Sequence, residues 1–82
     1  FKVTSAQANY LRSLPMHHSQ QEIERTSEFS IFRIVIKPTY DFQQEILKNG
    51  DDIEVLEPLW LRNKITDKIK GMWNKYNQKE DI

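Results

Sequence analysis

The sequence predicts a mixed α+β fold in which one antiparallel sheet packs against helices and a further helix follows at the C-terminal end. Residues 30–37 carry the alternating side-chain pattern of a half-buried strand. Residues 5–14 and the segment from Leu59 onward instead carry apolar residues at helical spacing. The 82 residues contain no repeat and no Pro- or Gly-rich linker, so we expect residues 1–82 to form a single domain.

The first half of the chain predicts a strand, a helix and a two-stranded hairpin. Residues 2–4 form a short strand, after which Ser5 is the expected N-cap of a helix that Pro15 ends. The apolar face of this helix consists of Ala6, Tyr10, Leu14 and the neighbouring Leu11. Residues 20–28 have too few apolar side chains for a core helix and predict an edge strand, which leads into the stronger strand at 30–37.

The two faces of the stronger strand differ in character. One face carries Phe32, Ile34 and Ile36. The other carries Ile31, Arg33, Val35 and Lys37. We expect the first face to meet the helices and the second to lie on the open side of the sheet.

The second half predicts a helix, a strand and a long terminal helix. Asp41 with Gln44 three residues later resembles a capping box, and Gly50 suits the left-handed position that closes a helix. The apolar side chains of this helix are Phe42, Ile46 and Leu47. Ile53 and Val55 then predict a strand, and Pro58 occupies the first position of the terminal helix. The terminal helix carries a stripe of Leu61, Ile65, Ile69, Met72 and Tyr76.

This element order, β-α-β-β-α-β plus one helix, predicts a ferredoxin-like sandwich with both crossover helices on one face of the sheet. The terminal helix has no slot in such a core. Its stripe must cover an end or the open face of the sheet, pack on a second chain, or dock on another domain. Trp60 and Trp73 flank the stripe, and we expect them to serve packing or docking.

Composition limits the classes of function. The chain has no cysteine, which excludes disulfides, thiolate zinc sites and a cysteine nucleophile, and fits a reducing, cytoplasmic location. Its longest apolar run, Ile34-Val35-Ile36, is far shorter than the about 20 residues that cross a bilayer, so we expect no membrane partner. The chain opens at Phe1 in what resembles the middle of a strand, so we expect it to be part of a longer polypeptide.

Formal charge sums to zero, but the two signs are segregated along the chain. Acids dominate residues 41–57 and bases dominate residues 62–79. These segments are either the solvated faces of ordinary elements or a docking surface for an anionic partner. In the terminal helix, Lys64 and Lys68 are candidate nucleic-acid contacts because lysines meet phosphates and the helix also carries aromatic side chains.

The densest polar cluster is Met16-His17-His18-Ser19-Gln20-Gln21, in the connection after the first helix. Adjacent histidines diverge on an extended backbone and no cysteine completes a ligand set, so we expect no metal site and no cofactor. A serine–histidine pair without a third orienting group or Gly-x-Ser-x-Gly predicts no catalysis. The cluster is either a polar loop that covers the sheet edge or a surface for ligand or interdomain recognition.

Several passages, taken in order, resemble the C-terminal extension (WCX) of WYL-domain transcriptional regulators. They are Tyr10-Leu11-Arg12, Leu14-Pro15, His17/His18-Ser19-Gln20, Asp41-Phe42, Glu45-Ile46-Leu47, Gly50-Asp51-Asp52-Ile53-Glu54-Val55-Leu56-Glu57-Pro58, Leu61-Arg62, and Met72 with Tyr76. The resemblance implies a module that follows a helix-turn-helix domain and a WYL domain in a bacterial regulator. In such regulators the extension contributes to dimerisation and to the surface that senses an effector, a nucleic acid or a nucleotide among the candidates.

We therefore expect a non-enzymatic regulatory module in which His17, Ser19, Gln20 and Arg62 contact the effector or a neighbouring domain. The alternative is an assembly module that joins two regulators and touches no ligand. The expected partners are the WYL and helix-turn-helix domains of the same polypeptide and a second copy of the full-length protein.

Overall fold

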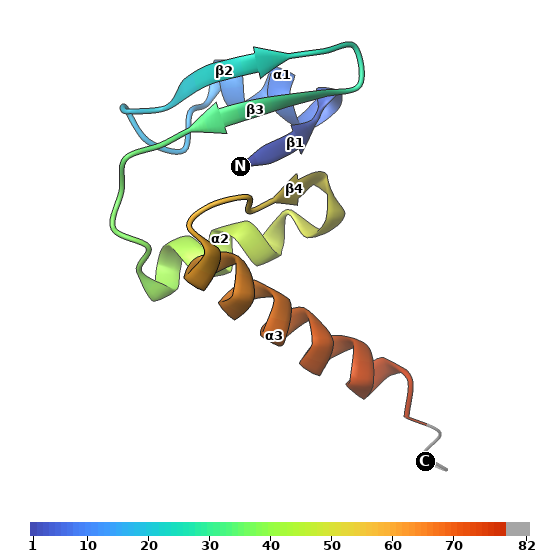
Figure 1. Ribbon diagram of the computed structural model, residues 1–82. Helices are drawn as coiled ribbons and strands as arrows, with labels where there is room; N and C mark the ends of the chain where they lie inside the picture. Colours follow the sequence, from blue (N-terminus) through green and yellow to red (C-terminus); the bar gives the residue numbers. More distant parts are fainter. Residues whose placement is uncertain (79–82) are drawn as a thin grey trace.

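A four-stranded antiparallel sheet and three α-helices make up the computed structural model, which describes residues 1–78 (Figure 1). The elements in chain order are β1 (Lys2–Thr4), α1 (Ser5–Ser13), β2 (Gln21–Arg25), β3 (Phe29–Arg33), α2 (Tyr40–Lys48), the 3-10 turn η1 (Gly50–Asp52), β4 (Ile53–Glu54) and α3 (Leu59–Tyr76). The predicted mixed class, with an antiparallel sheet and a long terminal helix, is confirmed.

The strands lie in the order β2-β3-β1-β4, and every neighbouring pair is antiparallel. Val3 pairs with Ser30 on one side and with Ile53 on the other, so these three side chains share the face that packs against the helices. A register shift between Glu22 and Glu24 marks a β-bulge in β2. As predicted, β2 is an edge strand, and all of its residues are exposed.

The first helix begins directly after β1, and this changes both its cap and its buried face. Thr4, not Ser5, is the N-cap, and its side-chain oxygen accepts a hydrogen bond from the N–H of Gln7 at 3.3 Å. The buried residues of α1 are Ala8 and Leu11, and the other predicted apolar positions, Ala6, Tyr10 and Leu14, are exposed. Because no loop separates β1 from α1, the direction of the strand decides which side of the helix turns toward the sheet.

The third strand is shorter than predicted. β3 ends at Arg33, and residues 34–39 leave the sheet without regular structure. Phe32 is buried as expected, but Ile36 lies beyond the strand and is exposed. The alternation in the sequence thus continues past the point where β2 can supply hydrogen bonds, since β2 begins at Gln21, opposite Arg33.

The second helix has its predicted face but a different cap. Thr39 caps it through a 3.3 Å hydrogen bond from the N–H of Phe42, so the capping box predicted at Asp41 is wrong. The predicted apolar residues pack on the core: Ile46 is buried, and Phe42 and Leu47 are half-buried. Gly50 has the left-handed φ of 59° that the sequence predicted after this helix, and it opens η1.

The core continues into the first turns of α3 only. Pro58 lies just before the helix, one position earlier than predicted, and Leu61 and Ile65 are buried. The buried apolar residues of the described chain are Val3, Ala8, Leu11, Phe32, Ile46, Ile53, Val55, Leu61 and Ile65. None of the helices in residues 1–78 is long and apolar enough to cross a membrane.

Candidate functional site

The polar loop between α1 and β2 holds a network of short hydrogen bonds around Ser19. The Ser19 hydroxyl accepts a bond from the N–H of Val35 at 2.9 Å and lies 3.2 Å from the Val35 carbonyl oxygen. Nδ1 of His17 lies 2.8 Å from the same hydroxyl and 3.1 Å from the N–H of Ser19. Ser19 therefore ties this loop to the extended segment that follows β3.

Gln20 fastens the same loop to α1. Its amide nitrogen donates to the carbonyl oxygen of Leu11 at 3.0 Å, and its amide oxygen accepts from the N–H of Met16 at 3.0 Å. Both ends of this side chain are thus used within the fold. His18 is exposed, and its ring lies 4.0 Å, centroid to centroid, from the ring of His17.

Arg62 lies on α3 beside β4, at the opposite edge of the sheet from β2. One guanidinium nitrogen is 2.7 Å from a Glu54 carboxylate oxygen and donates to the Val55 carbonyl oxygen at 2.8 Å. These bonds hold the start of α3 against β4. Among residues 1–78, no hydrogen bond or ion pair joins Arg62 to His17, Ser19 or Gln20, so the structure does not bring the four predicted site residues together.

Lys64 and Lys68 line a depression of about 320 Å³ between α2 and α3. Tyr40, at the start of α2, lines it as well, and most of its side chain is exposed. The other lining residues are Pro38, Gln43, Gln44, Leu47 and Ile65. Two lysines one helical turn apart therefore line the same depression as an exposed tyrosine.

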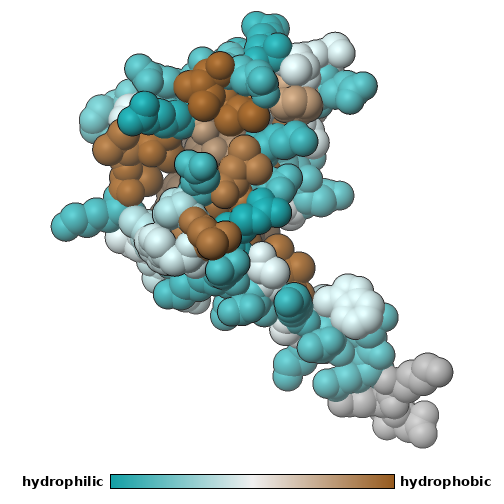
Figure 2. Space-filling model, viewed as in Figure 1, coloured by the Kyte–Doolittle hydropathy of each residue, from teal (hydrophilic) through white to brown (hydrophobic). Residues whose placement is uncertain are grey.

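The second half of α3 extends beyond the rest of the domain (Figures 1 and 2), and its apolar side chains are about half exposed or more in the described chain. Its exposed apolar residues, with the exposed fraction of each, are Ile69 (51%), Met72 (47%), Trp73 (63%) and Tyr76 (87%). Their spacing of three and four residues places them on one side of the helix. We call this set the α3 stripe.

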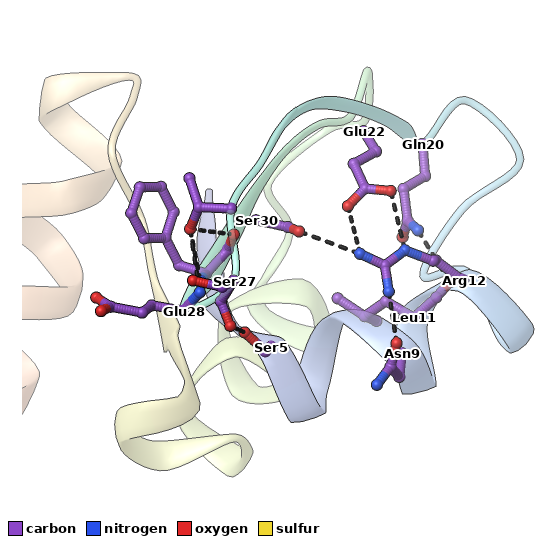
Figure 3. Close-up of polar contacts among 11 residues, drawn as sticks. Ser5, Asn9, Leu11, Arg12, Gln20, Glu22, Ser27, Glu28 and Ser30 are labelled. Carbon is purple, nitrogen blue, oxygen red and sulfur yellow. Dashed lines mark hydrogen bonds and ion pairs between the residues drawn. The ribbon is translucent and has the colours of Figure 1, made fainter.

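A polar cluster that sequence reasoning missed lies between α1 and β2 (Figure 3). Nε and Nη2 of Arg12 donate to the two carboxylate oxygens of Glu22, at 2.9 Å and 2.6 Å. Its remaining nitrogen donates to Oδ1 of Asn9 at 2.6 Å, and Nη2 also reaches the hydroxyl of the buried Ser30 at 3.2 Å. The hydrogen bonds from Arg12 lower the pKa of Glu22 to about 2. One feature of the sequence could have indicated this cluster: Ser30 lies on the core face of a predicted strand, where a buried hydroxyl needs a hydrogen-bond partner.

Comparison with known families gives a match over nearly the whole chain. The family model of the WCX domain matches residues 1–73. The chain belongs to the WCX domain family. No curated protein and no solved structure matches this WCX domain. The resemblance seen in the sequence is thereby confirmed.

The WCX domain is a C-terminal module of multidomain WYL regulators, and membership of this family is consistent with a role in transcription regulation. The family is associated with regulation and is not known as a family of enzymes. In residues 1–78 of this WCX domain, no three His, Cys, Asp or Glu side chains cluster in a way that could hold a metal ion.

Proposed function

We propose that this WCX domain is a non-catalytic assembly and regulatory module of a bacterial, cytoplasmic WYL regulator that also carries a helix-turn-helix domain. In this proposal residues 1–82 are one module, and its α3 stripe joins two copies of the regulator. The observation that carries the proposal is the α3 stripe, in which four exposed apolar side chains share one side of a helix whose first turns pack on the core.

The sheet and element order support a ferredoxin-like arrangement for the module. Two β-α-β units follow one another along the chain, and the sheet order β2-β3-β1-β4 puts β1 and β3 in the centre. In this arrangement α3 is an addition to the core, and its second half is available for a role outside it.

Burial energetics favour a partner on the α3 stripe. Each large apolar side chain that is fully removed from water contributes about 1.5–3 kcal/mol. Ile69 and Met72 are already about half buried and gain only part of this amount, whereas Trp73 and Tyr76 are more exposed. The four side chains on one helical face still favour a helix–helix contact, because monomeric domains rarely leave a large continuous apolar patch open. A two-fold contact between two α3 helices covers both stripes at once and matches the symmetry of most homodimers.

The test is the oligomeric state of the intact regulator with Ile69→Asp, measured by light scattering after size exclusion. Asn74→Asp is the matched control, because Asn74 is exposed on the same helical segment but outside the stripe. We expect Ile69→Asp to yield monomers and Asn74→Asp to leave the dimer intact. A dimer that persists in both variants would reject the stripe as the subunit contact.

A second candidate function is effector sensing, supported by the depression that Lys64, Lys68 and Tyr40 line. The lysines suit phosphates and the tyrosine ring suits a base, so the effector class is a nucleotide or a short single-stranded nucleic acid. His17, Ser19, Gln20 and Arg62 remain proposed contacts to the effector or to a neighbouring domain. His17 and Arg62 keep partly accessible side chains for this role.

Lys64→Glu with Lys68→Glu tests this second candidate, with Lys75→Glu as the control for a general loss of positive charge. We expect the double variant to weaken binding of a single-stranded oligonucleotide to the intact regulator by at least about tenfold, and the control to weaken it far less. Arg62→Ala is measured beside them. Unchanged affinity in that variant would remove Arg62 from the site.

A further inference from the structure

A depression of about 450 Å³ lies between α1 and the β2–β3 hairpin, apart from α3 and its stripe. The side chains that matter for its chemistry are those of Asn9, Arg12, Arg25 and Ser27. Ser5, Thr26 and Ser30 complete the lining, so every lining residue is polar and none carries a carboxylate.

Most acceptor atoms at the depression are already used inside the fold. Oδ1 of Asn9 accepts from Arg12 at 2.6 Å. The Ser27 carbonyl oxygen accepts from the Ser5 hydroxyl at 2.8 Å, and the Thr26 hydroxyl accepts from the N–H groups of Glu28 and Phe29 at 3.2 Å and 3.0 Å. These bonds fix the hairpin against the first turn of α1.

The side-chain polar groups that remain can each donate a hydrogen bond. In residues 1–78, the Arg25 guanidinium, Nδ2 of Asn9 and the Ser27 hydroxyl have no hydrogen-bond partner. In Figure 3 the amide oxygen of Asn9 faces the Arg12 side chain, and the amide nitrogen points away from it. A guanidinium, an amide N–H and a hydroxyl together match the oxygens of an anion.

The charge balance at the depression is also positive. Arg12 and Glu22 pair through their two-pronged contact, and Arg25, which also feels the Glu22 carboxylate at longer range, has no ion pair of its own in residues 1–78. The Glu28 carboxylate points away from Asn9 and Arg12 (Figure 3).

We propose that this depression, formed by Arg25, Asn9 and Ser27, binds a small oxyanion through a charge-assisted contact to Arg25 and two neutral donors. The chemical class is a phosphate group or a carboxylate group of a small molecule, since both present oxygens to the same donors. The site is independent of the α3 contact and of the Lys64–Lys68 depression, so it neither requires nor supports the function proposed above.

The experiment is an NMR titration of the chain with sodium phosphate, with sodium chloride adjusted to keep ionic strength constant. A parallel titration with N-acetylglutamate separates a carboxylate from a phosphate as the source of the oxygens. We expect saturable shifts at the Ser27 amide, the Asn9 side-chain amide and Nε of Arg25 with at least one of the two probes.

Arg25→Gln and Arg33→Gln are the matched pair for this titration, because both arginines are exposed but only Arg25 lines the depression. We expect Arg25→Gln to weaken binding about tenfold, as for the loss of one charge-assisted hydrogen bond, and Arg33→Gln to leave it unchanged. Shifts scattered over the surface, equal losses in both variants, or no saturable shift with either probe would overturn the proposal. Well-dispersed spectra of both variants verify that each is folded.

Discussion

Arg12 and Glu22 face each other with two parallel N–H···O contacts of 2.9 Å and 2.6 Å, which join the last turn of α1 to the edge strand β2. The same guanidinium reaches the hydroxyl of Ser30, a polar side chain buried in the centre of the sheet. This one arginine therefore provides an ion pair at the edge and a hydrogen-bond donor for the buried serine.

The Glu22 contact predicts a specific dependence of stability on pH. The pKa of Glu22 in the folded chain is about 2, below its ordinary value of 4.5. A lowered carboxylate pKa contributes stability above the unfolded-state value, and that contribution is lost as pH falls toward the folded-state value. The difference in unfolding free energy between the wild type and Glu22→Gln should be constant above pH 5 and shrink from about pH 4.5 to about pH 2. Urea denaturation at a series of pH values measures it.

The control for this prediction is Glu24→Gln, because Glu24 lies on the same strand and has no ion pair in residues 1–78. Its stability difference from the wild type should not follow the same pH curve. Identical curves for the two variants would show that the Arg12–Glu22 contact is not the source of the pH dependence of the unfolding free energy.

The two glycines predict opposite effects of the same substitution. Gly50 has φ of +59°, which costs an alanine about 1–2 kcal/mol, so Gly50→Ala should lower the unfolding free energy by that amount. Gly71 lies inside α3 with nothing near an added Cβ, so Gly71→Ala should raise it by about 0.5–1 kcal/mol. Thermal unfolding followed by circular dichroism checks both, and effects of the same sign would contradict this account.

The loop after α1 predicts a structural effect of Ser19. Ser19→Ala removes the acceptor of the Val35 N–H and the hydroxyl beside His17, which should cost about 1 kcal/mol of unfolding free energy. Amide hydrogen exchange at Val35 should become faster than in the wild type, whereas the exposed Ser13→Ala should leave it unchanged. Unaltered protection of Val35 would mean that Ser19 does not hold this segment.

Local sequence patterns predicted the helices and strands well where one residue type or spacing was decisive. They predicted less well where two nearby residues could each serve as a helix cap. The left-handed Gly50, the apolar face of α2 and the edge strand β2 followed directly from residue types and spacing. The caps did not, because Thr4 and Thr39 each lie just before a second plausible cap, and only the path of the backbone decides which side chain reaches the free N–H.

The candidate site was likewise predictable from the sequence only in part. His17, Ser19 and Gln20 do form a polar network, but their partners Val35 and Leu11 are backbone groups that no sequence motif marks. The Arg12–Glu22 pair joins a helix to a strand across a loop. Its formation depends on tertiary packing, so no periodic pattern in the sequence marks these two residues.

Ile65 and Ile69 lie one turn apart on the same helix, and we expect substitutions at the two positions to affect different properties. Ile65 should matter for the stability of the domain, and Ile69 for the association of two regulators. Ile65 is 7% exposed and belongs to the core, so Ile65→Ala should lower the unfolding free energy by about 2–4 kcal/mol. Ile69 is 51% exposed and lies beyond the last buried turn, so Ile69→Ala should lower the unfolding free energy of the monomeric domain by less than about 1 kcal/mol. Ile69→Ala should nevertheless weaken the dimer of the intact regulator. Chemical denaturation and sedimentation equilibrium on both variants measure the two effects separately. If Ile69→Ala instead destabilised the monomer as much as Ile65→Ala, the α3 stripe would be part of the core and would not serve as the contact surface proposed above.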